Sequence, residues 1–180
     1  GTMVPCDPNE PGANGRTCRC IGKIMKCYAM RETEEQMHRI FPYISAKGGE
    51  HGLYRPQIEF VNDDSFEIGP IKVERIKVEH GFPCCGYVID SKIAYVSDCH
   101  ELPETTVEKT KGVDTLILNC LREREHPTHL KLSAALEYIG RIAPRRAYLI
   151  HMCHDFTHEE WLRKLPKGVE PAYDGLEIEV

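Results

Sequence analysis

Three side chains that can bind a metal ion follow predicted strands at three points along the chain: His80, Asp98 and His151. Each comes just after an alternating or apolar run, where a strand is expected to end. Polar residues past the ends of strands lie at the rim of a sheet, where α/β proteins usually place their sites. Neutral imidazole and carboxylate are ligands that suit Zn, Mn or Fe in hydrolytic centres. The pattern therefore predicts a catalytic metal site at one edge of a sheet.

Each of these residues also has an ordinary structural explanation when it is considered alone. A histidine at a strand end is usually a hydrogen-bonded surface residue. An aspartate shortly before a helix, as Asp98 is, often caps that helix. Three such residues on successive strands, each with ligand chemistry, favour the metal site over three unrelated surface positions.

The elements expected to position these residues fall into two parts, a series of strands followed by alternating helices and strands. Strands are expected at 21–30, 58–61, 66–68, 71–78, 87–89, 93–96, 115–120, 147–150 and 176–180. Those over 58–61, 66–68 and 71–78 alternate apolar with charged residues, as half-buried antiparallel strands do. Helices are expected after a capping box of Thr33 and Gln36, over 103–111, over 133–142 with Ser133 as cap, and over 157–165. Strands followed by αβ repeats predict an α/β protein whose helices pack on a layered sheet.

Composition limits the function classes. A chain of 180 residues is expected to form one domain, 1–180, with an irregular Cys-containing segment over 1–20. Nine cysteines, an odd number, accompany nine histidines, which points to metal binding more than to disulfides. We expect no membrane span and no secretion signal, hence a cytoplasmic protein. The net charge of −5 argues against nucleic-acid binding.

The local sequence around the three residues is similar to that of a known family. The segments that carry the similarity are Val78-Glu79-His80-Gly81, Tyr95-Val96-Ser97-Asp98, His126-Pro127-Thr128-His129-Leu130, Leu149-Ile150-His151-Met152-Cys153-His154 and Tyr173-Asp174-Gly175-Leu176-Glu177-Ile178. In this order they resemble the metallo-β-lactamase superfamily, and within it the branch that contains phosphoribosyl cyclic phosphate phosphodiesterase. The similarity runs from about Tyr28 to Val180 and includes Phe41-Pro42-Tyr43.

This resemblance implies an αβ/βα sandwich with two metal ions at its edge, Zn or Mn and otherwise Fe. By resemblance, His80 is a ligand of one metal, Asp98 bridges both, and His151 is a ligand of the second. His129 matches a general acid or a substrate contact. The implied activity is hydrolysis of a cyclic phosphate or another small phosphodiester, in which water whose pKa the metals lower attacks phosphorus.

The same branch carries a separate structural zinc, which is implied here for Cys6, Cys18, Cys20 and His154. The family spaces its cysteines as C-x-C-x2-C, whereas a wide gap separates Cys6 from Cys18 in this chain. A zinc ion there would order a segment rich in glycine and proline. The competing interpretation is a segment with free thiols.

The motif HxHxDH, which supplies further metal ligands in the superfamily, is absent from the sequence. The N-terminal half of the fold is therefore expected to be incomplete, with an exposed sheet edge that favours a homodimer. Additional ligands for a single metal could come from Cys84, Cys85, Cys99 and His100. Two alternatives to a phosphodiesterase stay open: a degenerate protein that binds metal or a partner without catalysis, and an RNA-processing nuclease of the same superfamily.

Overall fold

The computed structural model describes residues 24–44 and 58–179. The chain divides into two compact units, Gly1–Asn62 and Asp63–Val180. Within the described residues, no helix is both long and apolar enough to cross a membrane. The predicted connection over 45–57 and the irregular segment over 1–20 lie outside the described residues.

The described part of the first unit, residues 24–44 and 58–62, contains a pair of short strands and one α-helix. Strand β1 (Met25–Tyr28) pairs in parallel with β2 (Ile58–Val61), and α1 (Arg31–Ile40) and the 3-10 turn η1 (Pro42–Ile44) lie between them in sequence. The antiparallel pairing expected for 58–61 is wrong, because two strands separated by a helix return in the same direction.

The start of α1 also differs from the prediction. The helix begins at Arg31, with Met30 at its N-cap and no side-chain cap. The capping box expected from Thr33 and Gln36 is therefore wrong, since both residues already lie inside the helix. A side-chain cap contributes only about 1 kcal/mol, so the chain's path out of β1 can override it.

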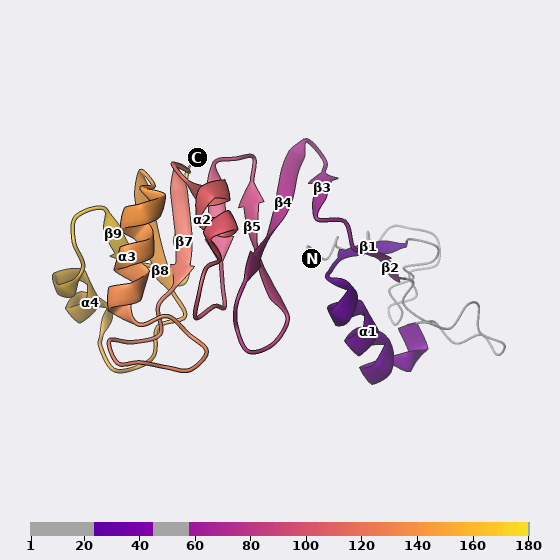
Figure 1. Ribbon diagram of the computed structural model, residues 1–180, viewed down its shortest axis with the longest axis horizontal. Coiled ribbons are helices and arrows are strands. Elements are labelled where there is room, and N and C mark those ends of the chain that lie inside the picture. The colour runs from indigo at the N-terminus through magenta and orange to yellow at the C-terminus, as the bar shows by residue number, and fades with distance from the viewer. Residues whose placement is uncertain (1–23, 45–57, 180) are drawn as a thin grey trace, which may run out of the picture. The chain divides into compact units, whose positions relative to one another are not determined.

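The second unit is built on a seven-stranded sheet with the order β3-β4-β5-β6-β7-β8-β9 (Figure 1). The strands are β3 (Ser65–Ile68), β4 (Ile71–Val78), β5 (Cys84–Ile89), β6 (Ile93–Val96), β7 (Thr115–Asn119), β8 (Arg146–Ile150) and β9 (Val169–Pro171). Pairing is antiparallel from β3 to β6 and parallel from β6 to β9. Two antiparallel steps separate β4 from β6, so β4 runs in the same direction as β6, β7 and β8. The carboxyl ends of these four strands therefore meet at one edge of the sheet.

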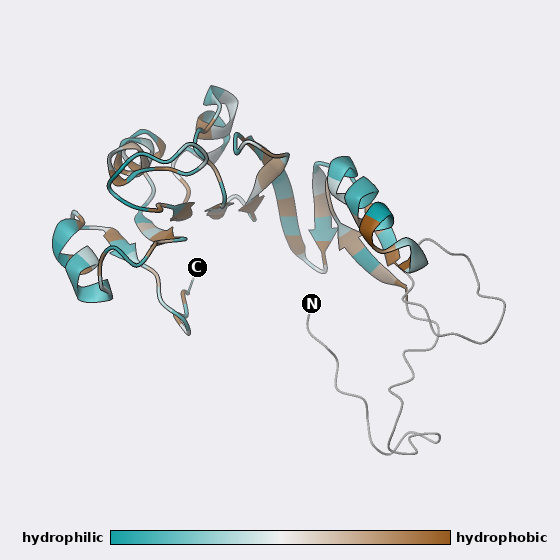
Figure 2. Cartoon of the chain, turned by 90° about the horizontal axis from the view of Figure 1, so that it is seen from below, coloured by the Kyte–Doolittle hydropathy of each residue, from teal (hydrophilic) through white to brown (hydrophobic). Residues whose placement is uncertain are grey.

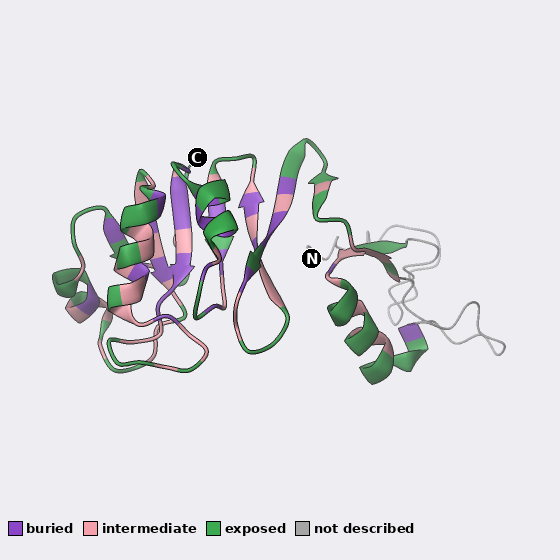
Figure 3. Cartoon of the chain, in the orientation of Figure 1, coloured by how far each residue is buried: buried purple, intermediate pink, exposed green. Residues whose placement is uncertain are grey.

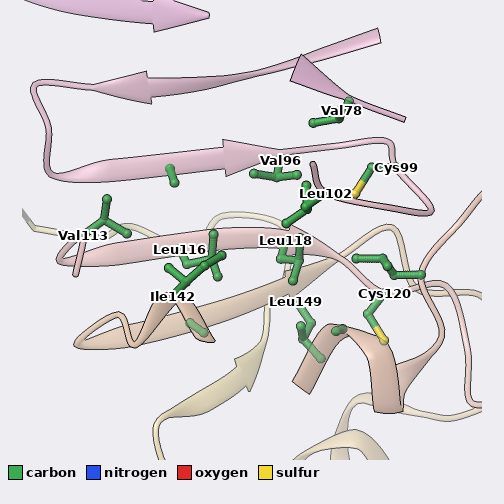
Figure 4. Close-up of a cluster of buried hydrophobic side chains, with 14 of the residues drawn as sticks. Val78, Val96, Cys99, Leu102, Val113, Leu116, Leu118, Cys120, Ile142 and Leu149 are labelled. Atoms are coloured by element: carbon green, nitrogen blue, oxygen red, sulfur yellow. The ribbon is translucent and has the colours of Figure 1, made fainter. Parts of the chain in front are cut away.

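Helices α2 (Glu104–Thr110) and α3 (Leu132–Ile142) lie against one face of this sheet, and α4 (His158–Lys164) precedes β9 (Figure 1). Hydrophobic residues run along the strands in Figure 2, and β7 is buried over almost its whole length in Figure 3. Leu116, Leu118 and Leu149 from neighbouring strands gather with Ile142 of α3 in one cluster (Figure 4), and none of the four is exposed to solvent. The α/β class expected from the sequence is confirmed.

Two predictions about this unit are wrong. Helix α3 begins at Leu132 with Lys131 at its N-cap and no side-chain cap, so Ser133 does not cap it. The final strand expected at 176–180 is not formed over 176–179, and β9 at Val169–Pro171 pairs with β8 instead. The short β9 lies directly after α4 and takes the available edge of β8, and its proline is tolerated because β9 is the outer strand.

Asp114 ties the starts of β7 and β8 together. Its carboxylate lies 2.6 Å from Arg145 Nε and 3.2 Å from Arg146 Nη2. The hydrogen bond from Arg145 holds the pKa of Asp114 below its ordinary value, with help from Thr115 and Arg146. A carboxyl whose pKa is lowered in the folded protein stabilises it above the unfolded-state pKa of about 3.9, and this stability is lost as the pH falls through the lower, folded-state value.

Asp114→Asn should therefore reduce the free energy of unfolding at neutral pH and have less effect in acid. The loss should be small, because the Arg145 side chain, which makes the shorter contact, is largely exposed to solvent. Urea unfolding of both proteins between about pH 7 and about pH 3 measures it. Two parallel curves of stability against pH would contradict the role given to Asp114.

Candidate metal centre

The shared edge of β4, β6, β7 and β8 brings four of the sequence-predicted site residues together. His80 lies two residues after β4, Asp98 two residues after β6, and His151 directly after β8. His129 lies in the connection between β7 and α3. His129 Nε2 is 3.9 Å from Asp98 Oδ2, and His151 Nδ1 is 3.8 Å from Asp98 Oδ1. Strand direction accounts for the meeting of His80, Asp98 and His151, and the connection after β7 brings His129 to them.

Three of the four form the tightest group of potential ligands. One ligand atom each from His80, Asp98 and His129 lie within 4.8 Å of one another, and all three residues are half-buried. The side chain of His151 is more open, with 42% of its surface exposed, and its Nε2 lies 3.0 Å from His129 Nε2. The sequence-based assignment of His80, Asp98 and His151 as ligands, with His129 as an acid or substrate contact, stays a prediction.

The surroundings of Asp98 favour the ionised form of its carboxyl. Burial raises the pKa of its carboxyl, but a hydrogen bond from the Ser97 hydroxyl and the nearby His151 and His129 outweigh burial, so the net pKa is lowered. At neutral pH the cluster therefore contains one carboxylate among imidazoles. Carboxylate and imidazole together are suitable ligands for a divalent cation.

The ring of His80 is held in one tautomer. Its Nδ1 lies 2.7 Å from the backbone carbonyl oxygen of Thr128, and a carbonyl can only accept a hydrogen bond. The Nδ1 of His80 therefore carries the proton, and its Nε2 lone pair is available. Histidines that bind metals usually donate their other ring N–H to a carbonyl or carboxylate in this way.

The segment that carries Asp98 is fixed to the core by Asn119, the last residue of β7. The Asn119 side chain accepts from Cys99 N at 3.0 Å and donates to Cys99 O at 3.0 Å, and it is fully buried. Leu130 N also donates to Cys99 O at 3.0 Å. This bond ties the connection that carries His129 to the segment that carries Asp98.

The backbone at His151 adopts an uncommon conformation. Its φ of 60° lies in the left-handed region, which a residue with a Cβ seldom occupies. Residues held in this way concentrate at functional sites. His151 adopts this conformation at the point where the chain leaves β8 toward α4.

The remaining candidate ligands are less suited to this centre. Burial raises the pKa of Cys99 to about 12, and its thiol donates to Asn119 Oδ1 at 3.0 Å, so it stays protonated inside the core. Cys84 donates to the carbonyl of Ser97 at 3.9 Å, and Cys85 donates to the Tyr87 hydroxyl at 3.5 Å.

The predicted structural zinc site cannot be assembled from the described residues. His154 is described and exposed. Its three partners Cys6, Cys18 and Cys20 lie outside the described residues, so this ligand set stays a prediction.

A cavity of about 430 Å³ adjoins the cluster through His129. Its lining residues are His100, Glu125, His126, Pro127, His129, Leu130, Lys131 and Ala134. Lys131 Nζ lies 2.6 Å from Glu125 Oε1 on its wall. A small polar or anionic molecule can therefore lie beside the cluster and contact His129.

Residues 16–152 match the family described as "Beta-lactamase superfamily domain". The chain belongs to this superfamily. The match includes His80, Asp98, His129 and His151. The fold with its helices and central sheet agrees with the metallo-β-lactamase fold that the sequence predicted.

Solved structures agree with this membership. A "New Diphosphatase from the PhnP Family" is 31% identical with a TM-score of 0.76, over 88% of this chain and 60% of that one. Zn(2+)-bound PqqB from Methylobacterium extorquens is 17% identical with a TM-score of 0.61, over 86% of this chain and 62% of that one, and shows the fold alone.

A curated relative has an unexpected name. "Octanoyltransferase" of Porphyromonas gingivalis is 35% identical over 162 residues, which are 88% of this chain and 33% of that protein. The chain thus spans about a third of the curated relative and less than two thirds of the diphosphatase.

Proposed function

We propose that this chain is a metal-dependent hydrolase that acts on a small phosphodiester, including cyclic phosphates, with Zn or Mn at the edge of the sheet. The observation that carries the proposal is the convergence of His80, Asp98, His129 and His151 beside an open cavity. The superfamily membership supports it.

The residues present fit a divalent cation. His80 offers a lone pair at Nε2, Asp98 offers an ionised carboxylate, and His129 and His151 lie within 4 Å of that carboxylate. When bound, the cation supplies Lewis acidity, which lowers the pKa of water and offsets negative charge on a phosphoryl group. Asp98 holds its negative charge at neutral pH, so it can remain a ligand throughout the reaction.

The cavity determines which substrates fit. Lys131 and the imidazoles of His100 and His126 place donors on its wall, which favours an anionic molecule. Glu125 neutralises part of this charge through Lys131, which favours a substrate with few phosphates. A volume of about 430 Å³ suits a small molecule. The cavity and the net charge of −5 favour a small phosphodiester over RNA, the substrate of the nuclease alternative.

Metal removal and replacement test the proposal. The purified chain is treated with EDTA, reloaded with Zn or Mn, and assayed with bis(p-nitrophenyl) phosphate, while elemental analysis gives the metal content. We expect turnover to disappear with EDTA and to return with the metal. The monoester p-nitrophenyl phosphate is the matched control and should react more slowly.

A different result would favour the alternatives. Tightly held metal without turnover of the diester would contradict the proposed hydrolase and support a metal-binding protein without catalysis. Faster cleavage of an RNA oligonucleotide than of the small diester would support the nuclease.

A further inference from the structure

We propose that the pair formed by Lys131 and Glu125 determines which substrates the cavity accepts. The preferred substrate is a phosphodiester whose substituent carries hydroxyl groups and no further phosphate. Lys131 binds this substituent, and Glu125 offsets the attraction that Lys131 alone would exert on a second phosphate. The inference rests on the proposed function for the reacting diester group, whereas the selectivity itself is measurable as binding without turnover.

The pair belongs to the loop over residues 122–131, which connects β7 to α3 and is closed at its base. Arg122 and Lys131 form an isolated β-bridge, and Leu132 N donates to Arg122 O at 2.9 Å. A compact loop whose ends adjoin is packed by its own side chains. The backbone of Lys131, at the N-cap of α3, is therefore fixed against the start of the loop.

Arg122 also positions the second member of the pair. Its Nη2 donates to the backbone carbonyl oxygen of Glu125 at 3.0 Å. Glu125 Oε1 in turn lies 2.6 Å from Lys131 Nζ. The hydrogen bond from Lys131 holds the pKa of Glu125 below its ordinary value, so the carboxyl is ionised at neutral pH. The loop therefore presents a carboxylate and an ammonium in contact on the cavity wall.

His129 connects this wall to the cluster, because it belongs to both. Its Nε2 lies 3.9 Å from Asp98 Oδ2, and its side chain lines the cavity together with Lys131 and Glu125. A diester whose phosphorus lies at the cluster therefore has room for its substituent in the cavity that the pair lines. The pair contacts the part of the substrate that does not react.

The chemistry of the pair suits a hydroxyl group better than a phosphate. The Lys131 ammonium has three N–H donors and uses one toward Glu125, whose carboxylate keeps acceptor lone pairs. A hydroxyl group both donates and accepts, so it can bond to both members of the pair. A phosphate is attracted by the ammonium, repelled by the adjacent carboxylate and deprived of part of its hydration. The pair therefore gives a second phosphate little net affinity.

The exposure of the two side chains limits the size of this effect. Lys131 has 35% of its side-chain surface exposed and Glu125 has 83%. Water and salt weaken interactions between exposed charges. Removal of either charge should therefore change the preference between two ligands by a moderate factor, and that factor should decrease at high salt.

Calorimetric titration of the Zn-reloaded chain with glycerol monophosphate and with glycerol bisphosphate tests the proposal. The two probes differ only in a second phosphate that replaces a hydroxyl group, and neither is a diester. The unaltered chain should bind the bisphosphate no more tightly than the monophosphate. E125Q should shift the preference toward the bisphosphate by about fivefold, and K131M should shift it by about the same factor toward the monophosphate.

E108Q is the matched control. Glu108 pairs with Lys111 on the surface of α2, with Oε1 and Nζ 3.3 Å apart, and it does not line the cavity. E108Q changes the net charge of the chain by the same amount as E125Q, so it should leave the preference unchanged. The shift in E125Q should also shrink at about 0.5 M NaCl, where the Debye length is short. Circular dichroism shows whether each variant is folded.

Equal preferences in E125Q and E108Q would contradict the role given to Glu125. Binding of neither probe, or a strong preference of the unaltered chain for the bisphosphate, would overturn the proposal as a whole. The expected preferences in a chain that does not turn over bis(p-nitrophenyl) phosphate would count against the hydrolase and leave the selectivity of the cavity standing.

Discussion

D98N should lose metal-dependent turnover of bis(p-nitrophenyl) phosphate and bind the metal at least about 100-fold more weakly. The amide keeps the shape of the carboxylate and can still accept from the Ser97 hydroxyl, so the fold should be unaffected. The amide is neutral, so D98N removes the negative charge that Asp98 contributes to the cluster. Groups that only orient a ligand are worth about 10- to 100-fold in affinity, and a charged ligand should be worth more.

The matched control is D90N. Asp90 lies in the turn between β5 and β6, at the opposite end of β6 from Asp98, where its carboxylate accepts from Lys72 N at 2.8 Å. Both variants remove one negative charge from the same hairpin region, so a general electrostatic effect would appear in both. Turnover in D98N equal to that of D90N would rule out the centre described here.

Much of the site could be predicted because strand ends are visible in sequence. The alternating run over 71–78 and the apolar run over 93–96 coincide with β4 and β6, so the positions just beyond them were identified correctly as rim positions. That these rims coincide in space follows from two antiparallel steps between β4 and β6. Side chains placed by strands are predictable to this extent.

The loop between β7 and α3 shows where sequence reasoning stops. The segment His126-Pro127-Thr128-His129 resembles the corresponding segment of the superfamily. Its residue types do not indicate that the backbone of Thr128 contacts the rings of both His80 and His126. Those contacts depend on a backbone carbonyl and a backbone amide, which every residue except proline has. Asn119 likewise reads as an ordinary polar residue at the end of a buried strand.

Helix starts show a similar limit. The capping box that forms is one the sequence analysis did not name, the reciprocal pair of hydrogen bonds between Thr157 and Glu160 at the start of α4. Thr33 and Ser133 lie inside their helices, which begin one or two residues earlier. A side-chain cap is worth only about 1 kcal/mol, so the residue type of a cap does not by itself fix where a helix begins.

The HxHxDH motif, which is absent from this sequence, supplies metal ligands in the family. In the family, two metals share ligands from HxHxDH and from the later strand ends. Here His80, Asp98 and His151 follow β4, β6 and β8, and His129 lies in the connection after β7. A metal ion held by these residues would supply Lewis acidity toward a phosphoryl oxygen.

N119A should lower the free energy of unfolding by about 2–4 kcal/mol and also weaken metal binding. Asn119 is fully buried and pairs with both the N–H and the C=O of Cys99, the residue next to Asp98. Alanine leaves the Cys99 N–H without this acceptor inside the core, which costs about 1–3 kcal/mol, and removes packed atoms as well. This is a large part of the stability of an ordinary domain.

The control for N119A is T115A at the other end of β7. Thr115 is also buried, and its hydroxyl bonds Asp114 and Arg146, far along the strand from the cluster. Both variants should unfold at lower urea concentration, but only N119A should lose Co(II) affinity under conditions where both are folded. Equal Co(II) affinity in the two variants would show that Asp98 keeps its place without Asn119. Lower affinity in N119A alone would show that a buried amide in the core holds the metal ligand in position.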